Sequence, residues 1–522
     1  MRKYIKTNLS TILFSFFFAL VLLLDTKLTF NGESISAFTN VMWGTFSFID
    51  IVWFCFFFCI TYILLKNIVK FYNKVPVKDV NKKKLPILKI SFCVLVIAWL
   101  PYLLTYFPGG VYYDTFASIK QVENGLSGLT NHNPVLYTLI LKLFITLGEI
   151  THVGLKGGLF YFLVVQYITC ALILSYAVKV IYKKQISKWY AYGTLLFFAL
   201  FSLVPFYVIS IWKDTPFSFV LFLFITFLLD KGTYFANSKK DFLCYLLLAL
   251  LICFLRNNGI LILLGMTFLI FLSNKNKKFL LSSWGLLLIV LFIQGPVYSH
   301  FHMNGSTFLE ASAIPFQQIT YSIREGIELD EADYNFIKSI MPLGTLKGAY
   351  TSVNFDTIKF HQSFNSYAFS SGKKEFLRLW LKLLPKNFSN YVEAYLLQTL
   401  GFWDYLRGND TAYIQNTIWE NDYHLEQTDL IEKVSGISLK KVLEPKVYLS
   451  SALFVWVSFL SMILVVQKKK YKHLLYYAPC IVLWVSIMIG TPIAFSLRYV
   501  YVFVLFLPFS FIIPLLSESE RK

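Results

Sequence analysis

Long apolar stretches separated by short polar gaps dominate the chain. About 20 apolar residues are needed to cross the hydrocarbon core of a bilayer, and about twelve stretches are predicted as membrane-crossing helices by this criterion. They cover residues 11–30, 42–65, 87–107, 157–180, 189–208, 215–230, 241–256, 258–273, 279–297, 447–467, 474–490 and 494–516. The pattern predicts an all-α polytopic membrane protein.

Lysine is concentrated in alternate gaps between these stretches. The basic N-terminus and the gaps at 66–86, 179–188, 231–240, 275–278 and 468–472 hold most of the clustered lysines, whereas 31–41 holds neither lysine nor arginine. Because positively charged loops stay on the cytoplasmic side, these gaps and both termini are expected there, in a multi-pass protein of the cell membrane. The first apolar stretch lacks a convincing small-residue cleavage site and is interpreted as an uncleaved helix.

Residues 133–148 look helical but are too short to cross the membrane, and counting them as a span would place the basic gap at 179–188 outside. Thr138, Lys142 and Thr146 recur every four residues and draw one polar stripe, which is typical of a helix lying flat at the interface. Asn133 is expected to cap its start, with Pro134 at the first helical position. Residues 108–156 then form one long outer loop.

A second short helix is predicted in this loop at about 115–124, opened by Asp114 and closed by Gly125. The chain thus divides into four regions. They are two N-terminal helices with a basic loop (1–86), a membrane core with the outer loop 108–156 (87–297), a polar extracytoplasmic segment predicted as a helical cap (298–446), and the C-terminal helices (447–522).

Composition agrees with a lipid-solvated chain. Hydrophobic residues make up 57% and charged residues 15%, against about 45–50% and 25% in soluble proteins. The net charge of +19 would suit a nucleic-acid partner, but its lysines lie in the loops rather than on one soluble face, so no nucleic acid is expected. All seven cysteines lie inside apolar runs, without metal-ligand spacing or a disulfide framework.

Unusual polar residues fall at the outer ends of the predicted helices and in outer loops. They are Asp114, Gln121, His132, Asn133, Trp212–Asp214, Arg256–Asn258 and Arg498. Charges at membrane depth cost about 2.5–3.5 kcal/mol each, so they usually pair or line a cavity. One shared outer cavity would place carboxylates beside fixed cations, which suits a reaction on an anionic, lipid-bound substrate.

The order of these features resembles the GT-C superfamily of integral-membrane glycosyltransferases, closest in pattern to a bacterial branch. The residues that carry the resemblance are FPGGVYYDTFASIKQ (107–121), NHNPVLYTLILKLF (131–144), WKDTPFS (212–218), RNNG (256–259) and SLRYVYVF (496–503). It covers roughly 87–300 well and the last helices loosely. It implies two juxtamembrane helices and an acidic catalytic residue in the first outer loop, and a polyprenyl-phosphate-linked sugar as donor.

The chain departs from the superfamily pattern in three places. Many members carry an acidic pair in this loop, whereas here Tyr113 and Thr115 flank Asp114, so a divalent metal is not supported and no cofactor is expected. The juxtamembrane helix starts with His132-Asn133-Pro134 instead of a double-proline motif. About two helices precede the similar region.

The resemblance and the polar cluster together assign roles. Asp114 would be the general base on the acceptor hydroxyl, with capping of the short helix as the plainer interpretation. The residues expected to contact substrate are His132, Lys213, Asp214, Arg256, Asn257, Gln317 and Arg498, with Arg256, Arg498 and Lys213 on the phosphate.

Structural alternatives stay open for these residues. Arg256 could snorkel or end a helix, Asp214 could cap 215–230 or pair with Lys213, and Arg498 and His132 could be structural. Gln317, in AIPFQQITYS (313–322), could line an acceptor groove or pack inside the cap. Asp50 is expected beside Lys27 near the outer interface, with an ion site as the sharper alternative.

The favoured function is inverting transfer of a sugar from a polyprenyl-phosphate donor to an envelope glycan, lipid or polymer on the extracytoplasmic face. The alternative is a transporter or flippase of a lipid-linked glycan, for which charges across the bilayer depth and an inverted repeat would be expected. A third is a non-catalytic membrane scaffold, which would leave the clustered charges unexplained.

Overall fold

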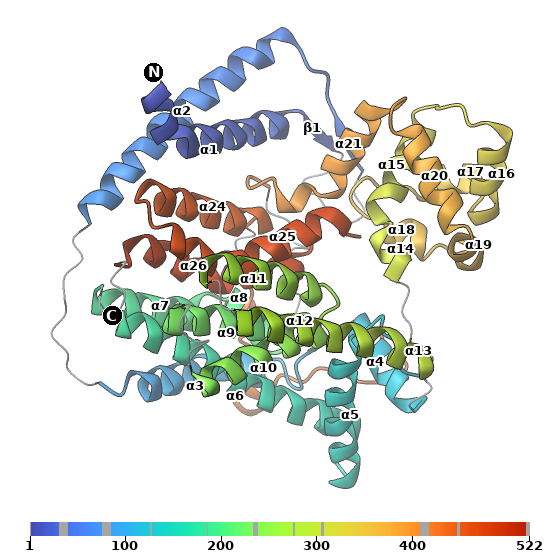
Figure 1. Ribbon diagram of the computed structural model, residues 1–522. Coiled ribbons are helices and arrows are strands. Elements are labelled where there is room, and N and C mark those ends of the chain that lie inside the picture. The colour runs from blue at the N-terminus through green and yellow to red at the C-terminus, as the bar shows by residue number, and fades with distance from the viewer. Residues whose placement is uncertain are drawn as a thin grey trace.

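A computed structural model describes residues 2–30, 40–75, 85–125, 128–184, 186–232, 238–274, 277–303, 307–407, 417–445 and 449–517. The structure is 75% helical and 3% strand, which confirms an all-α membrane protein. Helices of the body run side by side, and a helical lobe stands at one end of them (Figure 1). Both termini lie at the opposite end of the body.

Every predicted apolar stretch is helical over most of its length. The helices of the body are α1 (Arg2–Thr26), α2 (Phe48–Lys74), α3 (Ile87–Thr105), α6 (Gly154–Lys183), α7 (Lys188–Leu200), α8 (Leu203–Val208), α9 (Asp214–Lys231), α10 (Lys239–Leu255), α11 (Gly259–Asn274), α12 (Lys277–Phe292), α24 (Ser451–Gln467), α25 (Ala478–Gly490) and α26 (Tyr501–Ile512).

By length and composition, six helical segments of the described chain could cross a membrane. They are Asn8–Thr26, Phe48–Lys74, Ile87–Thr105, Gly154–Lys183, Leu280–His300 and Leu497–Leu515. The last two are composite. A π-helical turn (Ile293–Val297) and α13 (Tyr298–His300) continue α12, and 3-10 turns at Leu497–Val500 and Ile513–Leu515 flank α26.

The first two predicted spans have different ends in the structure. Strand β1 (Leu28–Phe30) pairs antiparallel with β2 (Val41–Trp43), so the end of the first stretch and the start of the second are strand instead of helix, and α2 runs on to Lys74. Lys27 Nζ lies 2.7 Å from Asp50 Oδ1, which confirms the expected neighbours. The Asp50 carboxylate also accepts a hydrogen bond from the Ser47 backbone N–H at 2.6 Å, so it stabilises the start of α2.

Two short helices lie in the loop 108–156, as predicted. They are α4 (Tyr113–Glu123) and α5 (Val135–Ile150), and α5 crosses the ends of the body helices (Figure 1). Gly125 follows α4 with a φ of 70°, a backbone conformation that glycine adopts without strain.

The predicted polar details of these helices are partly wrong. Asp114 lies in the first turn of α4 rather than at its cap, and Pro134 occupies the cap position of α5, because the Asn133 amide bonds elsewhere. Thr138 is buried against the protein, whereas Leu143 and Ile150 are exposed. The exposed side of α5 is therefore mainly apolar.

The polar segment 298–446 contains a helical lobe and, after it, a segment that leads back to the body. The lobe is built from α14 (Thr307–Ala311), α15 (Ala313–Arg324), α16 (Glu331–Ile340), α17 (Leu343–Ala349), α18 (Asp356–Lys359), α19 (Ser366–Ser371), α20 (Lys373–Leu383) and α21 (Phe388–Gln398). Phe316, Phe369 and Phe376 pack in its own core. The chain then returns to the body through α22 (Leu430–Ser435) and α23 (Lys440–Leu443), where the Thr428 N–H donates to Phe107 O at 2.8 Å.

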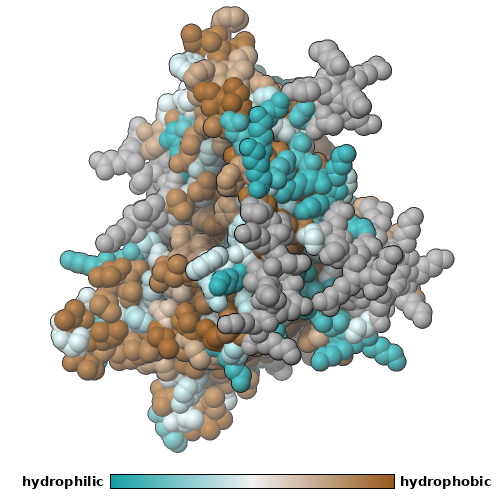
Figure 2. Space-filling view, turned by 90° about the vertical axis from the view of Figure 1, so that its left-hand side faces the viewer, coloured by the Kyte–Doolittle hydropathy of each residue, from teal (hydrophilic) through white to brown (hydrophobic). Residues whose placement is uncertain are grey.

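The end of the body that carries both termini is rich in lysine. Figure 2 faces this end and shows hydrophilic side chains beside hydrophobic surface. Among the described residues, α2 contributes Lys70 and Lys74, and Lys183 at the end of α6 pairs with Asp230 at 2.7 Å. The lysine-bearing end of α2 and the helical lobe therefore lie at opposite ends of the body (Figure 1).

Contacts of Arg407 with two aspartates join α1 to the segment that follows α21. Arg407 hydrogen-bonds the Asp25 carboxylate, and Arg407 Nε lies 3.7 Å from Asp404 Oδ2. The Asp404 side chain is fully buried, and this burial raises its pKa to about 7. The protonated carboxyl is therefore the form that the fold favours.

Replacing Asp404 by asparagine is expected to stabilise the protein at pH 8. Because the folded-state pKa of Asp404 is raised, folding becomes less favourable as pH rises from the ordinary value of 3.8 through about 7, and asparagine avoids that ionisation. The melting temperature of the solubilised full chain should rise by about 1–3 °C at pH 8. The gain should be smaller at pH 5, where folded-state Asp404 is protonated and only part of the pH-dependent loss of stability has developed, and an equal gain at both pH values would contradict this explanation.

Candidate active site

Two matching turns lie side by side at the lobe end of the body. Strand β3 (Gly110–Val111) pairs in parallel with β4 (Ser210–Ile211), with Val111 opposite Ile211. Each strand is followed by an aromatic residue, one variable residue, and an Asp-Thr pair in the first turn of α4 or α9. The same short pattern thus occurs twice, and strand pairing brings the two aspartates, Asp114 and Asp214, to neighbouring helix starts.

Local hydrogen bonds shape both turns in the same way. The backbone N–H of Thr115 donates to Tyr112 O at 2.9 Å, and that of Thr215 donates to Trp212 O at 3.1 Å. The Thr115 hydroxyl donates to the carbonyl of Ile211 and links the two turns. The rings of Tyr112 and Trp212 stack with centroids 4.4 Å apart.

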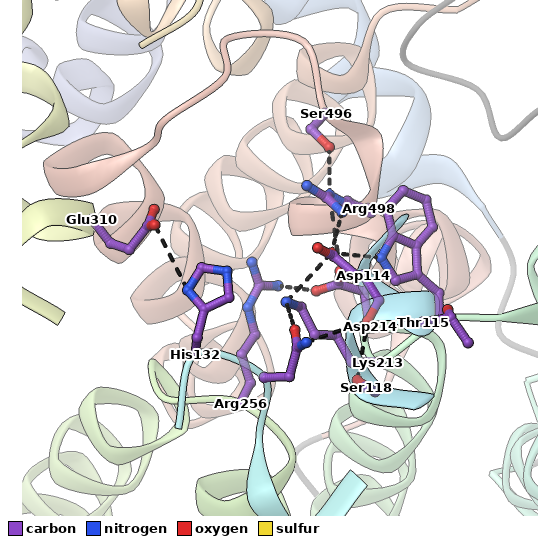
Figure 3. A network of polar contacts seen from close by, with 12 residues as sticks. Asp114, Thr115, Ser118, His132, Lys213, Asp214, Arg256, Glu310, Ser496 and Arg498 are labelled. Carbon is purple, nitrogen blue, oxygen red and sulfur yellow. Dashed lines mark hydrogen bonds and ion pairs between the residues drawn. The ribbon is translucent and has the colours of Figure 1, made fainter. Parts of the chain in front are cut away.

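One oxygen of the Asp114 carboxylate is held by three groups. Oδ2 accepts hydrogen bonds from Trp212 Nε1 and Arg498 Nη1, both at 2.9 Å, and lies 3.3 Å from Lys213 Nζ (Figure 3). Oδ1 accepts no hydrogen bond from any residue that the structure describes. The Asp114 side chain is 20% exposed, so its second oxygen can receive a donor from a bound molecule.

The charges around Asp114 keep it ionised. Burial alone would raise the pKa of this carboxyl, but the charges of Lys213 and Arg498 and the hydrogen bond from Trp212 outweigh burial and hold the pKa well below its ordinary value. Asp114 is therefore a carboxylate across the physiological range, and no proton has to be lost before it can accept a hydrogen bond.

Lys213 connects this carboxylate to the segment that precedes α5. Its Nζ donates to Asn133 Oδ1 at 2.7 Å, and Asn133 Nδ2 donates to the backbone oxygen of Asp114 at 3.3 Å. The position before α5 is thus tied to the first turn of α4. This network occupies the Asn133 side chain that the sequence pattern assigned to helix capping.

Asp214 holds both arginines. Its Oδ1 lies 3.1 Å from Arg256 Nη1, and its Oδ2 lies 3.9 Å from Arg498 Nε. The side chain is 2% exposed, and Asp214 is the first residue of α9 rather than its N-cap residue, which is Lys213. Arg498 consequently bridges Asp114 and Asp214, and Arg256 is fixed at the turn between α10 and α11.

Aromatic faces hold the two guanidinium groups. Arg498 lies over Trp212 at 4.3 Å and Tyr499 at 4.8 Å, and Arg256 lies over Tyr499 at 4.9 Å and Phe217 at 5.3 Å. Arg498 also donates to the Tyr499 hydroxyl at 3.0 Å. Such contacts stabilise a partly desolvated cation and restrict its orientation, so both arginines are presented in fixed positions.

The lobe contributes a second polar group beside this cluster. His132 Nδ1 lies 3.9 Å from Glu310 Oε1, and Lys359 Nζ contacts both Glu310 Oε1 and Asp356 Oδ1 at 2.8 Å. Burial and the charge of Lys213 lower the pKa of His132, although Glu310 opposes this effect. His132 is therefore neutral at pH 7 and lies between the lobe and the cations (Figure 3).

Two of the residues expected to contact substrate lie elsewhere. Asn257 Nδ2 donates to the backbone oxygen of Asn131 at 3.1 Å and so supports the loop that carries His132. Gln317 is fully buried in α15, and its Nε2 donates to Thr351 O and Gln398 Oε1, both at 2.8 Å. The structure brings together His132, Lys213, Asp214, Arg256 and Arg498 around Asp114, but does not bring Gln317 there.

Sequence reasoning did not assign roles to the aromatic residues of the site. Trp212 precedes Lys213 directly and Tyr499 follows Arg498, so each is the chain neighbour of a predicted cation. An aromatic residue next to a charged one at the end of an apolar helix is the sequence signal that could have predicted these two site residues. The repeated apolar–aromatic–x–Asp–Thr pattern was a second one.

The arrangement can hold an anion and accept a proton. Among the residues that the structure describes, Lys213, Arg256 and Arg498 form ion pairs with two carboxylates, those of Asp114 and Asp214, so this inner cluster carries one excess positive charge. Asp114 offers one open carboxylate oxygen at its edge. The described residues contain no group of three or more potential metal ligands, and both aspartates already contact cations that would repel a divalent metal.

Comparisons with known proteins place the chain in one family. No match to a curated protein or to a solved structure was found. The model of DUF6020, a family of unknown function, matches residues 122–522. This range begins after Asp114 and contains His132, Lys213, Asp214, Arg256 and Arg498. Since the match spans well over half of the sequence, the chain belongs to the DUF6020 family.

Proposed function

We propose that the protein is a membrane glycosyltransferase of the GT-C type that moves a sugar from a polyprenyl-phosphate donor to an envelope acceptor. The observation that carries this proposal is the Asp114 carboxylate, with Oδ2 anchored by Trp212 and Arg498 and Oδ1 open. A base that must take a proton from an acceptor hydroxyl needs such a fixed, ionised and accessible oxygen.

The proposed reaction is a direct displacement. The acceptor hydroxyl donates its proton to Asp114 Oδ1 while its oxygen forms a bond to the anomeric carbon of the donor sugar. The bond between that carbon and the phosphate oxygen breaks, and its electron pair leaves with the polyprenyl phosphate. Lys213, Arg256 and Arg498 stabilise the charge on the departing phosphate, and a single displacement inverts the anomeric carbon.

The proposed membrane topology follows from the positions of charge. Twelve apolar helical stretches form the membrane domain in the cell membrane, with the lysine-rich end and both termini in the cytoplasm. The site and the lobe then lie on the extracytoplasmic face. The donor's lipid chain stays in the bilayer, and its phosphate reaches the cations at the outer helix ends.

A deletion strain tests the proposed function directly. Without the enzyme, the polyprenyl-phosphate-linked sugar should accumulate and one sugar should be missing from an envelope component. Mass spectrometry of extracted lipids and envelope polymers measures both, with the wild-type gene on a plasmid as the control. Unchanged lipid-linked sugars together with an intact envelope would contradict the proposal.

Accessibility labelling separates a transferase from a transporter of lipid-linked glycans. In a background lacking the seven native cysteines, His132→Cys should react with a membrane-impermeant thiol reagent from the outer face only, because 39% of the His132 side chain is exposed beside the lobe. An equal reaction from the cytoplasmic side would favour alternating access and the transporter.

A further inference from the structure

Two fully buried glutamines connect the lobe to the chain segment that carries Arg498. Gln317 lies in α15 and Gln398 ends α21, and neither side chain is exposed. Gln317 Nε2 donates to Gln398 Oε1 at 2.8 Å. Gln398 Nε2 in turn donates to Thr491 O at 3.1 Å and to Pro492 O at 2.7 Å. The pair therefore ends on two backbone carbonyls beyond the last residue of α25.

Backbone contacts fix the same segment to the lobe. The Phe355 N–H donates to Pro492 O at 2.8 Å, and the Ala494 N–H donates to Val353 O at 2.9 Å. Two residues after Ala494, the Ser496 hydroxyl accepts a hydrogen bond from Arg498 Nε at 3.0 Å. The segment 491–496 thus lies between the glutamine pair and the guanidinium that bridges Asp114 and Asp214.

We propose that the Gln317–Gln398 pair is a positioning device that sets Arg498 in the candidate active site through the segment 491–496. The expected effect of this pair on the rate of transfer rests on the proposed function. Gln317 was expected to contact substrate, but its amide nitrogen is fully engaged by protein acceptors. The pair acts on the site through the backbone, and the lobe is thereby part of the active-site framework.

Only an amide side chain can make these contacts at position 398. Its oxygen accepts from Gln317 while its nitrogen donates to two carbonyl oxygens. A glutamate would place an acceptor against those carbonyls, and a methionine of similar volume offers no donor. Loss of the amide leaves buried polar groups of both partners without their hydrogen bonds, which frees the segment to move.

Gln318 provides a matched control on the same helix. It is also a buried glutamine, but Nε2 donates to Tyr391 O at 2.9 Å and Oε1 accepts from Trp380 Nε1 at 2.7 Å, so both contacts stay inside the lobe. Gln318→Met should loosen the lobe without reaching the segment 491–496. Gln398→Met should loosen the segment.

Hydrogen exchange of the full-length protein in lipid nanodiscs tests this difference without a substrate. In Gln398→Met, peptides that cover 493–500 should exchange at least about tenfold faster than in wild type, because the Ala494 N–H loses its fixed acceptor geometry. In Gln318→Met these peptides should keep wild-type protection. Unchanged exchange in Gln398→Met, or equal acceleration in both variants, would overturn the positioning role.

A double-mutant comparison tests the effect on transfer. Gln398→Met should lower kcat about tenfold, and adding it to Arg498→Ala should cause no further loss, because both changes act through the same guanidinium. Multiplicative losses would overturn the proposal. If the wild-type protein transfers no sugar but the exchange result is as expected, the proposed function fails and the positioning of Arg498 stands.

Discussion

Replacing Asp114 by asparagine is expected to lower the rate of sugar transfer by about 10³-fold, within the range that general base catalysis contributes. Asparagine keeps the shape of the side chain and can still accept a hydrogen bond from Trp212, but it cannot take a proton from the acceptor hydroxyl. The initial rate in membranes supplied with a polyprenyl-phosphate-linked sugar measures the effect. The donor's KM should change little.

Glu123→Gln offers a matched control at the other end of α4. Glu123 is exposed and accepts a hydrogen bond from the Tyr423 hydroxyl at 3.0 Å, so its neutralisation removes an acidic group from the same helix without touching the site. It should transfer sugar at the wild-type rate. A near-wild-type rate in Asp114→Asn, at equal protein level, would show that Asp114 is not the base.

The pH dependence of transfer should carry a signature of the same cluster. Because the cations lower the pKa of Asp114 below its ordinary value of 3.8, the carboxylate stays ionised as pH falls, and its contribution is lost only below that value. We expect no acidic limb from Asp114 between about pH 5 and 7. A rate that falls with an apparent pKa in that interval would mean that another group, such as His132, limits the reaction.

Replacing Arg498 by alanine is expected to be as damaging as loss of the base. The change removes the group that bridges Asp114 and Asp214 and a cation for the leaving phosphate, and a lost transition-state contact of this kind costs about 10²–10³ in kcat. Arg498→Lys should recover only part of the rate, because one ammonium cannot reproduce the two-sided contact of the guanidinium.

Stability should fall together with activity in Arg498→Ala. Two carboxylates of low exposure would lose a shared partner, and breaking a buried pair costs about 3–5 kcal/mol, less where solvent reaches the group, as it does at Asp114. Arg324→Ala is the control, since Arg324 also lies over an aromatic ring, that of Tyr350, but within the lobe. A variant at position 498 with wild-type melting and rate would contradict the bridging role.

The helices could be predicted from sequence because apolar runs of membrane length leave few alternatives. The convergence of Asp114, Lys213, Arg256 and Arg498 was predictable for a related reason. Ionised groups near lipid must pair or line a polar site, and the sequence pattern places these four residues at helix ends on one predicted side of the membrane. Their individual partners were not predictable, since the capping interpretation of Asp114 and Asp214 fitted the sequence equally well.

The pairing of very short strands could not be predicted from the pattern of apolar and polar residues. Strands β3 and β4 have two residues each, far too few for an alternation of polar and apolar positions, yet their pairing places both aspartates. The hairpin of β1 and β2 likewise looks like the ends of two apolar spans. Gln317 was misplaced because an amide among aromatic residues suits both a sugar site and a buried polar contact inside a lobe.

The bridging arginine also constrains how the protein is made. Asp114 and Arg498 are separated by 384 positions, and nine of the thirteen body helices named above, α6 to α12, α24 and α25, lie between them in chain order. A nascent chain must therefore insert those helices before its two aspartates meet their common counter-charge. Until that last segment is made, Asp114 and Asp214 have Lys213 and Arg256 as their counter-charges among the described residues, so the cluster reaches its final charge balance late in synthesis.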